Sequence, residues 1–185
     1  MPTISGMRRR GFTPSSIRTF CEKVGIAKRE NVIDFSLLEF CLRDDLNNSA
    51  LRAMAVLDPV KLVITNYEAG KTEDLTSENG PDESSGHRVV PFGRELWIEK
   101  EDFMEVPAKK WFRLAPGASV RLKSAYIVTC DSFVKDDAGH VTEIHCTYHP
   151  DSKSGSDTSG IAVKGTIHWV SAAHAAPAEI RLYDR

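Results

Sequence analysis

Cations and aromatic rings alternate in the stretch Lys109-Lys110-Trp111-Phe112-Arg113, which suits it to binding an anionic partner. Arg121 and Lys123 follow two residues apart, so both would point to the same face of a β-strand. Single-stranded RNA binds such surfaces, because Arg and Lys reach phosphates and base edges while unstacked bases stack on rings. The pattern therefore predicts an RNA-binding strand face. Ordinary solvated charge is the alternative.

Histidine and cysteine, residue types that bind zinc, gather at His140, His145, Cys146 and His149. His145 and His149 fit an H-x₃-H spacing, but on a strand this offset spreads the rings too far apart for easy chelation. We therefore expect no metal site, and interpret the cluster as alternating positions of a β-hairpin.

A catalytic centre is not expected in this chain. Ser171 lies near His168 and His174, but no G-x-S-x-G turn accompanies them. The paired carboxylates Asp44-Asp45 and Asp136-Asp137 fall at a helix end and in a turn, where such residues cap helices or form turns. The sequence also has no P-loop and no G-x-G-x-x-G motif.

Short helices are expected before residue 50, over 3–10 and over 34–46. Between them, Thr13 as N-cap followed by proline starts another helix, and Gly25 ends it. From residue 50 onward, runs rich in Val, Ile, Thr and aromatic residues predict short strands and an antiparallel barrel or sandwich. The expected strands cover residues 56–65, 95–98, 120–134, 141–148, 163–170 and 178–183.

Three details complete this prediction of strands and loops. Pro59 lies inside the first strand, so we expect an edge position or a bulge there. Asp136-Asp137-Ala138-Gly139 is typical of a hairpin turn. The polar segments 68–88 and 150–160 are interpreted as mobile loops.

The composition is that of an ordinary globular chain, with 185 residues, 41% hydrophobic and 27% charged residues, and a net charge of −2. No apolar run approaches the about 20 residues that cross a bilayer, and no signal peptide follows the arginines near the N-terminus. We therefore expect a cytoplasmic protein without membrane contact. Its four cysteines are expected to be free thiols.

Several segments resemble glutaminyl-tRNA synthetases of bacterial type. These are MPTISGMRRRGFTP (1–14), LRDDLN (42–47), RAMAVLDP (52–59), VKGTIHWVSAAHA (163–175) and RLYDR (181–185). The resemblance implies a class I aminoacyl-tRNA synthetase, which uses ATP, with magnesium, to join glutamine to tRNA. The family's two ATP signatures, His-Ile-Gly-His and a Lys-Met-Ser-Lys-Ser-like loop, are absent here. We therefore expect a fragment of a longer enzyme that has no cofactor of its own.

The resemblance implies an α+β fold with two parts. Residues 1–49 would be a helical connector at the end of the catalytic region. Residues 50–185 would be an anticodon-binding β-barrel, ribosomal protein L25-like and incomplete at its C-terminus. An incomplete barrel would expose an edge strand that can pair with another chain.

The expected partner is tRNA-Gln, with no DNA and no membrane. Carried over by position, the expected anticodon-contacting residues are Asp34, Arg52, Lys110, Arg113, Arg121 and Lys123. Position 110 is often a neutral amide in the family and position 123 is often Arg. Lys lacks the bidentate fork of Arg, so Lys123 is expected to contact phosphate rather than a base. For Asp34, the alternative is a helix-start charge favoured by the helix dipole.

Three other functions remain open at this point. A glutamate–tRNA ligase fragment would differ in the amino acid, although bacterial members typically carry a helical anticodon domain in place of a barrel. A stand-alone RNA-binding protein of the ribosomal type would not need the helical connector. A pure protein-interaction module would bury the basic strand face against another protein.

Overall fold

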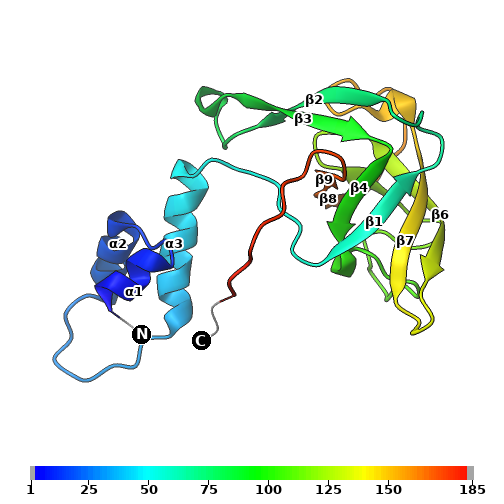
Figure 1. The fold of residues 1–185 in the computed structure, drawn as a ribbon. Helices are drawn as coiled ribbons and strands as arrows, with labels where there is room; N and C mark the ends of the chain where they lie inside the picture. The colour runs from blue at the N-terminus through cyan, green and yellow to red at the C-terminus, as the bar shows by residue number, and fades with distance from the viewer. Residues whose placement is uncertain (1–2, 183–185) are drawn as a thin grey trace. The chain divides into compact units, whose positions relative to one another are not determined.

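The computed structural model describes residues 3–182. The chain folds as two compact units, one made of Met1–Arg52 with Glu78–His87 and the other of Ala53–Ser77 with Arg88–Arg185. The first unit is helical and the second contains a curled sheet, so the α+β fold is confirmed (Figure 1). Residues 1–2 and 183–185, which carry the ends of the family resemblance, lie outside the described residues.

The helical unit contains α1 (Ile4–Arg9), α2 (Pro14–Val24) and α3 (Phe35–Ser49). As expected, the Thr13 side chain caps α2 by accepting the main-chain N–H of Ser16, and Gly25 ends the helix with a positive φ of 66°. The third helix runs a few residues beyond the expected end. Asp45 of α3 accepts hydrogen bonds from the hydroxyls of Ser15 and Thr13, which lower its pKa and tie α3 to the start of α2.

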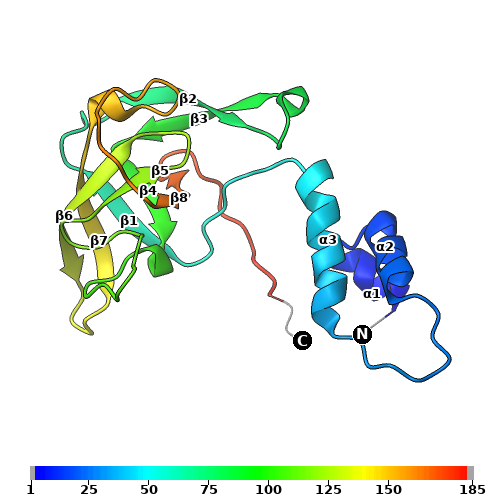
Figure 2. The ribbon, with the colours of Figure 1, turned by 180° about the vertical axis from the view of Figure 1, so that it is seen from behind.

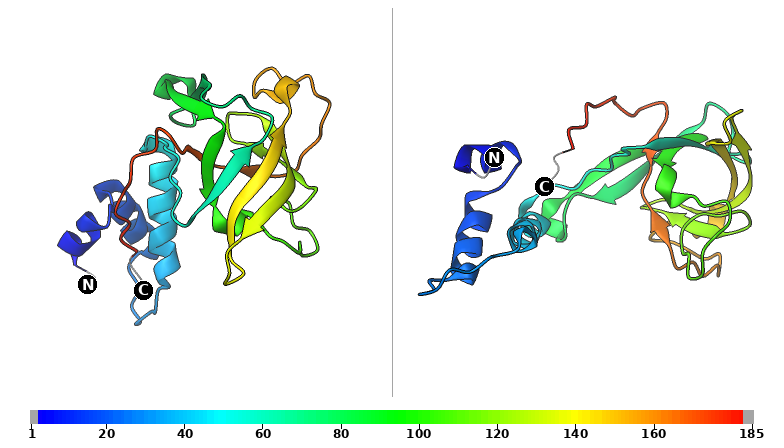
Figure 3. Two further views of the ribbon diagram at one scale, coloured as in Figure 1. Left: turned by 45° about the vertical axis from the view of Figure 1, so that its right-hand side comes forward. Right: turned by 90° about the horizontal axis from the view of Figure 1, so that it is seen from below.

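The second unit is a seven-stranded sheet in the order β8-β5-β6-β7-β1-β4-β9. The strands are β1 (Pro59–Ile64), β4 (Glu95–Glu99), β5 (Ser119–Leu122), β6 (Ile127–Lys135), β7 (Val141–Tyr148), β8 (Thr166–Ile167) and β9 (Val170–Ser171). Figure 2 and the right-hand view of Figure 3 show the sheet curled into a half-barrel. Most pairings are antiparallel, but β1 pairs with β7, and β5 with β8, in parallel.

Two terminal strands of this sheet, β8 and β9, are each two residues long. They follow each other in sequence, separated by His168 and Trp169. A separate two-stranded sheet is formed by β2 (Thr72–Glu78) and β3 (His87–Gly93), and three short 3₁₀ helices lie at Glu83–Ser85, Lys100–Asp102 and Pro150–Ser152.

The core lies inside the curled sheet and is rich in aromatic rings. Phe92 and Trp169 are fully buried and meet edge to face, with ring centroids 5.3 Å apart. Tyr67, Tyr126 and Tyr148 extend this aromatic cluster. Aliphatic side chains from alternate strand positions fill the rest, as in Val60, Leu62 and Ile64 of β1.

Several local expectations were wrong. Pro59 is not on an edge strand, because β1 lies between β7 and β4. It is the first residue of β1, where proline is tolerated; it is in register with Glu99 of β4, whereas the pairing with β7 begins at Lys61. Residues 120–134 form two strands with a tight turn between them, in which Ser124 has a φ of 59°. Residues 68–88 contain β2 rather than only a loop, and residues 178–182 form no strand.

The expectations for the hairpin turn and for the free thiols were confirmed. The hairpin turn at 136–139 closes with the main-chain N–H of Asp136 donating to His140 O at 2.9 Å. Gly139 in this turn has a φ of 83°, a conformation that favours glycine. The three cysteines Cys41, Cys130 and Cys146 are buried free thiols, and Cys21 is an exposed one. Within residues 3–182, no helix has both the length and the apolar character needed to span a bilayer.

Candidate nucleic-acid interface

Arg113 has a fixed edge and an open edge. Its Nη1 donates to Asp102 Oδ1 at 2.6 Å, and its side chain remains 47% exposed while that of Asp102 is only 6% exposed. Burial raises the pKa of Asp102 above its usual value, although the neighbouring guanidinium of Arg113 favours the charged form. The carboxylate therefore orients the guanidinium and leaves its other donors available to a ligand.

The guanidinium of Arg121 already has partners. Nη1 donates to Ser152 O at 2.7 Å, and Nη2 donates to the Asp157 carboxylate. Hydrogen bonds from Ser159 and the charge of Arg121 hold the pKa of Asp157 below its usual value. Arg121 thus connects β5 to the polar segment 150–160, which the sequence presented only as a mobile loop.

Lys123 lies just past the end of β5 and is exposed. Its backbone continues the ladder, because its N–H donates to Ile167 O at 2.9 Å and its carbonyl accepts from Trp169 Nε1 at 3.0 Å. Buried Val120 and Leu122 alternate with outward-facing Arg121 and Lys123, as the expected strand face requires. No ion pair of the Lys123 side chain occurs within residues 3–182.

The two rings of the aromatic stretch lie in different environments. Trp111 is half-buried, and its indole N–H donates to Leu114 O at 3.0 Å. Phe112 is 50% exposed, and the Lys164 ammonium lies 5.2 Å from its ring centroid. Phe112 is therefore the ring that can stack on a base. Exposed Lys110 precedes them with a φ of 67°.

One close backbone approach brings these residues together. A Cβ added to Gly165 would lie 1.7 Å from Phe112 O, so the two chain segments touch at a position that only glycine allows. The carbonyl of Gly165 accepts the main-chain N–H of Arg121 at 3.0 Å. The aromatic stretch and β5 therefore meet at Gly165, with Lys164 beside them. Sequence reasoning missed Lys164, because only the β5–β8 pairing brings it to Phe112.

Comparison with known proteins identifies the family of the chain. Residues 50–149 match the family described as "tRNA synthetases class I (E and Q), anti-codon binding domain". The chain belongs to this family.

Individual relatives of this anticodon-binding domain extend the match to the whole chain. A glutamine–tRNA ligase of Clostridium perfringens is 58% identical over 185 residues, which are 100% of this chain and 34% of the relative. Proteins of the same name from Vibrio parahaemolyticus and Clostridium kluyveri are 57% and 55% identical, again over 100% of this chain. The chain spans about a third of the length of these curated relatives.

Within the anticodon-binding domain, the other candidate clusters have structural partners. His145 pairs with Glu143 at 2.5 Å, and His149 is hydrogen-bonded to Thr129 at 2.8 Å. Residues 3–182 contain no group of three or more His, Cys, Asp or Glu side chains placed to hold a metal ion.

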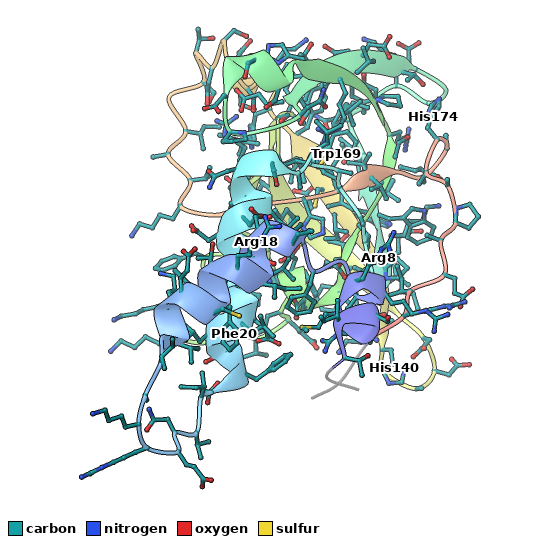
Figure 4. The ribbon with its side chains drawn as sticks, turned by 90° about the vertical axis from the view of Figure 1, so that its left-hand side faces the viewer. Arg8, Arg18, Phe20, His140, Trp169 and His174 are labelled. Carbon is teal, nitrogen blue, oxygen red and sulfur yellow. The ribbon has the colours of Figure 1, made fainter. Side chains whose placement is uncertain are left out.

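Ser171, His168 and His174 do not form a catalytic triad. Ser171 Oγ lies 3.0 Å from His174 Nδ1, within one turn of the chain. His168 instead contacts Ala55 O at 2.8 Å. Figure 4 labels His174 on the segment that follows β9.

Asp34 and Arg52 belong to the helical unit and are described within it. Asp34 is the N-cap of α3, where its carboxylate accepts the main-chain N–H of Ser36 at 2.7 Å. Arg52 is exposed, and its main-chain N–H donates to Asn79 O at 2.7 Å. Neither contact tests an RNA-binding role for Asp34 or Arg52, so that role stays a prediction.

Proposed function

We propose that this chain recognises the anticodon of glutamine tRNA as part of a cytoplasmic glutamine–tRNA ligase. The observation that carries the proposal is the close approach at Gly165, whose Cα lies against the Phe112 carbonyl and whose own carbonyl accepts the N–H of Arg121. It joins the segments that carry Arg113, Arg121 and Lys123, all inside the stretch that matches the anticodon-binding family. The full-length similarity to glutamine–tRNA ligases supports glutamine as the amino acid.

Each residue of this surface has a proposed role. Arg113 presents its open edge to a base, and Phe112 stacks on that base or its neighbour. Lys123, with a single charged head, contacts phosphate. Arg121 contacts RNA only when RNA replaces Asp157 as its partner. Lys110, exposed and next to Trp111 in the sequence, is a further candidate for RNA contact.

The helical part has a different proposed role. We place the boundary between a helical connector, 1–49, and the anticodon-binding part, 50–185. Asp34 and Arg52 are the connector's candidates for RNA contact. Neither ATP signature of the family occurs in the 185 residues. The proposed role of the chain is therefore RNA binding and includes no step of glutamine activation.

Fluorescence anisotropy with anticodon stem-loops of glutamine and glutamate tRNA, repeated across salt concentrations, tests the proposal. We expect tighter binding of the glutamine loop, and loss of this preference in Arg113→Ala. Lys61→Ala is a matched control, because β1 is separated from β5 by two strands and Lys61 pairs with Glu95 at 3.0 Å. Equal affinity for the two loops with a steep salt dependence would mean phosphate attraction alone and would contradict anticodon reading by this chain.

A further inference from the structure

Two buried thiols lie opposite each other on neighbouring strands of the curled sheet. Cys130 of β6 is in register with Cys146 of β7, and the two residues are 1% and 0% exposed. Both belong to the same buried core, so both side chains point to the inner face of the sheet. Neither cysteine is among the residues assigned above to RNA binding.

The main-chain hydrogen bonds show which kind of cross-strand pair the two cysteines form. The N–H of Cys130 donates to Ala118 O at 3.1 Å, and its carbonyl accepts from Gly117 N at 2.9 Å. The carbonyl of Cys146 accepts from Thr65 N at 2.8 Å. These main-chain groups therefore point away from the partner strand, as in a non-hydrogen-bonded pair. The Cα atoms of such a pair lie about 4.5 Å apart, and its side chains are the closest in a sheet.

This spacing suits a disulfide, because bridged cysteines have Cα atoms about 4.4–6.8 Å apart. The ladder is also interrupted on one side of the pair, since the register shifts between Cys130 and Ser132. A bulge of this kind bends its strand and loosens the local pairing. The strands can therefore adjust to a bridge between Cys130 and Cys146 without a change of register.

The two thiols interact with each other in the reduced chain. A hydrogen bond with Cys146 lowers the pKa of the Cys130 thiol, whereas the same bond and burial raise the pKa of Cys146. As a neutral thiol, Cys130 donates from Sγ to Ser132 O at 3.7 Å. Cys130 is thus the thiol that ionises first, and the thiolate is the form that reacts with oxidants.

We propose that Cys130 and Cys146 are an oxidative modification site, which hydrogen peroxide converts into a reversible cross-strand disulfide. The Cys130 thiolate attacks one oxygen of the peroxide, which forms a sulfenic acid and releases hydroxide. The Cys146 sulfur then attacks the Cys130 sulfur, the S–O bond breaks, and the hydroxyl group leaves as water with the Cys146 proton. Since the released hydroxide takes up the proton that Cys130 lost, two thiols and one peroxide give one disulfide and two water molecules.

The disulfide has two consequences for the chain. Cys146 resolves the sulfenic acid of Cys130 before further oxidation becomes irreversible. The bridge also closes the β6–β7 hairpin in the unfolded chain, so the urea midpoint rises by about 1–2 M. A thiol reductant reverses both changes. The inference is independent of the proposed function, because it uses only the core of the sheet.

The test uses the full chain with its exposed thiol removed, Cys21→Ser, so that bridges between molecules do not form through that residue. Cys41 of α3 is then the matched control, because it is a buried thiol and the helical unit contains no second cysteine in this variant. The folded, reduced protein is treated with hydrogen peroxide, quenched with catalase and alkylated in urea.

Tryptic digestion and mass spectrometry then identify the bridge. Trypsin cuts after Lys123, Lys135 and Lys153, so Cys130 and Cys146 are released in the separate peptides 124–135 and 136–153. We expect these two peptides to be joined by a bond that dithiothreitol breaks, and Cys41 to be fully alkylated. Adding Cys146→Ala to this variant should abolish the joined peptides and leave Cys130 as sulfenic or sulfinic acid.

Urea unfolding of the oxidised and reduced forms of the same Cys21→Ser chain tests the fit of the bridge to the native sheet. We expect the oxidised form to have the higher midpoint, by about 1–2 M, and dithiothreitol to return it to the reduced value. Absence of the joined peptides from the folded chain, oxidation of Cys41 to the same extent, or an unchanged or lower midpoint after oxidation overturns the inference.

Discussion

Arg121 has a structural role in addition to its proposed RNA-binding role, and mutation can separate the two. In the structure its guanidinium holds the segment 150–160 through Ser152 O and the Asp157 carboxylate. Ser152 is fully buried, and its hydroxyl accepts the N–H of Ile127 at 2.7 Å. Replacing Arg121 by alanine therefore removes the donor from a carbonyl in a buried turn that also supports β6.

The size of the effect follows from the bond that is lost. A hydrogen bond to a charged group contributes about 1.5–3 kcal/mol, and the Arg121 side chain is only 22% exposed. We expect Arg121→Ala to lower the free energy of unfolding by about 1.5–3 kcal/mol, and Tm by about 4–10 °C. Lys135→Ala is the control, because its pair with Glu105 is more exposed, with side chains 36% and 46% accessible, and should change stability by less than about 0.5 kcal/mol.

The RNA-binding role is tested by the partner of Arg121. Asp157→Asn removes the carboxylate that competes with RNA, so we expect about a two- to fivefold gain in affinity for the glutamine stem-loop and a steeper salt dependence. Urea unfolding and anisotropy measure the two effects on the same variants. Arg121→Ala with unchanged stability would refute the structural reasoning. Asp157→Asn with unchanged or weaker RNA binding would refute the exchange of partners.

Three further outcomes are expected. Gly165→Ala places a Cβ 1.7 Å from a main-chain oxygen and should destabilise the protein by about 3 kcal/mol, as measured by urea unfolding. Gly93→Ala is the control and should be near neutral, because the nearest atom to its Cβ is 3.5 Å away. Equal effects of the two variants would argue against the close approach. Burial and a hydrogen bond to Glu73 raise the pKa of Tyr126. The neutral phenol therefore contributes to the free energy of unfolding in full below the unfolded pKa of about 10, and this contribution is lost as pH rises further. Absorbance titration should show Tyr126 ionising at higher pH than free tyrosine. Among four cysteines only Cys21 is exposed, so one thiol should alkylate rapidly in the native protein and the others only on unfolding, as mass spectrometry will show.

Local features were predictable from the sequence alone. The start of α2 at Thr13, its end at Gly25 and the hairpin turn closed by Gly139 depend on hydrogen bonds between residues at most five apart. Turns and helix caps can be predicted from such short stretches, because each residue type supplies its own donor, acceptor or permitted φ. The alternation of cations and rings had already predicted RNA binding and identified Arg113, Arg121 and Lys123. The family resemblance added the anticodon as the expected target and Asp34 and Arg52 as candidates.

Only the tertiary structure decided which of those candidates meet and what they already bind. The parallel pairing of β5 with β8 brings Gly165 and Lys164 to Phe112, across about fifty positions of sequence. The partner of Arg121 lies on a polar segment whose composition predicted only mobility. No local pattern encodes such contacts, because a parallel pairing needs a long connection and its register is set by burial of the whole sheet.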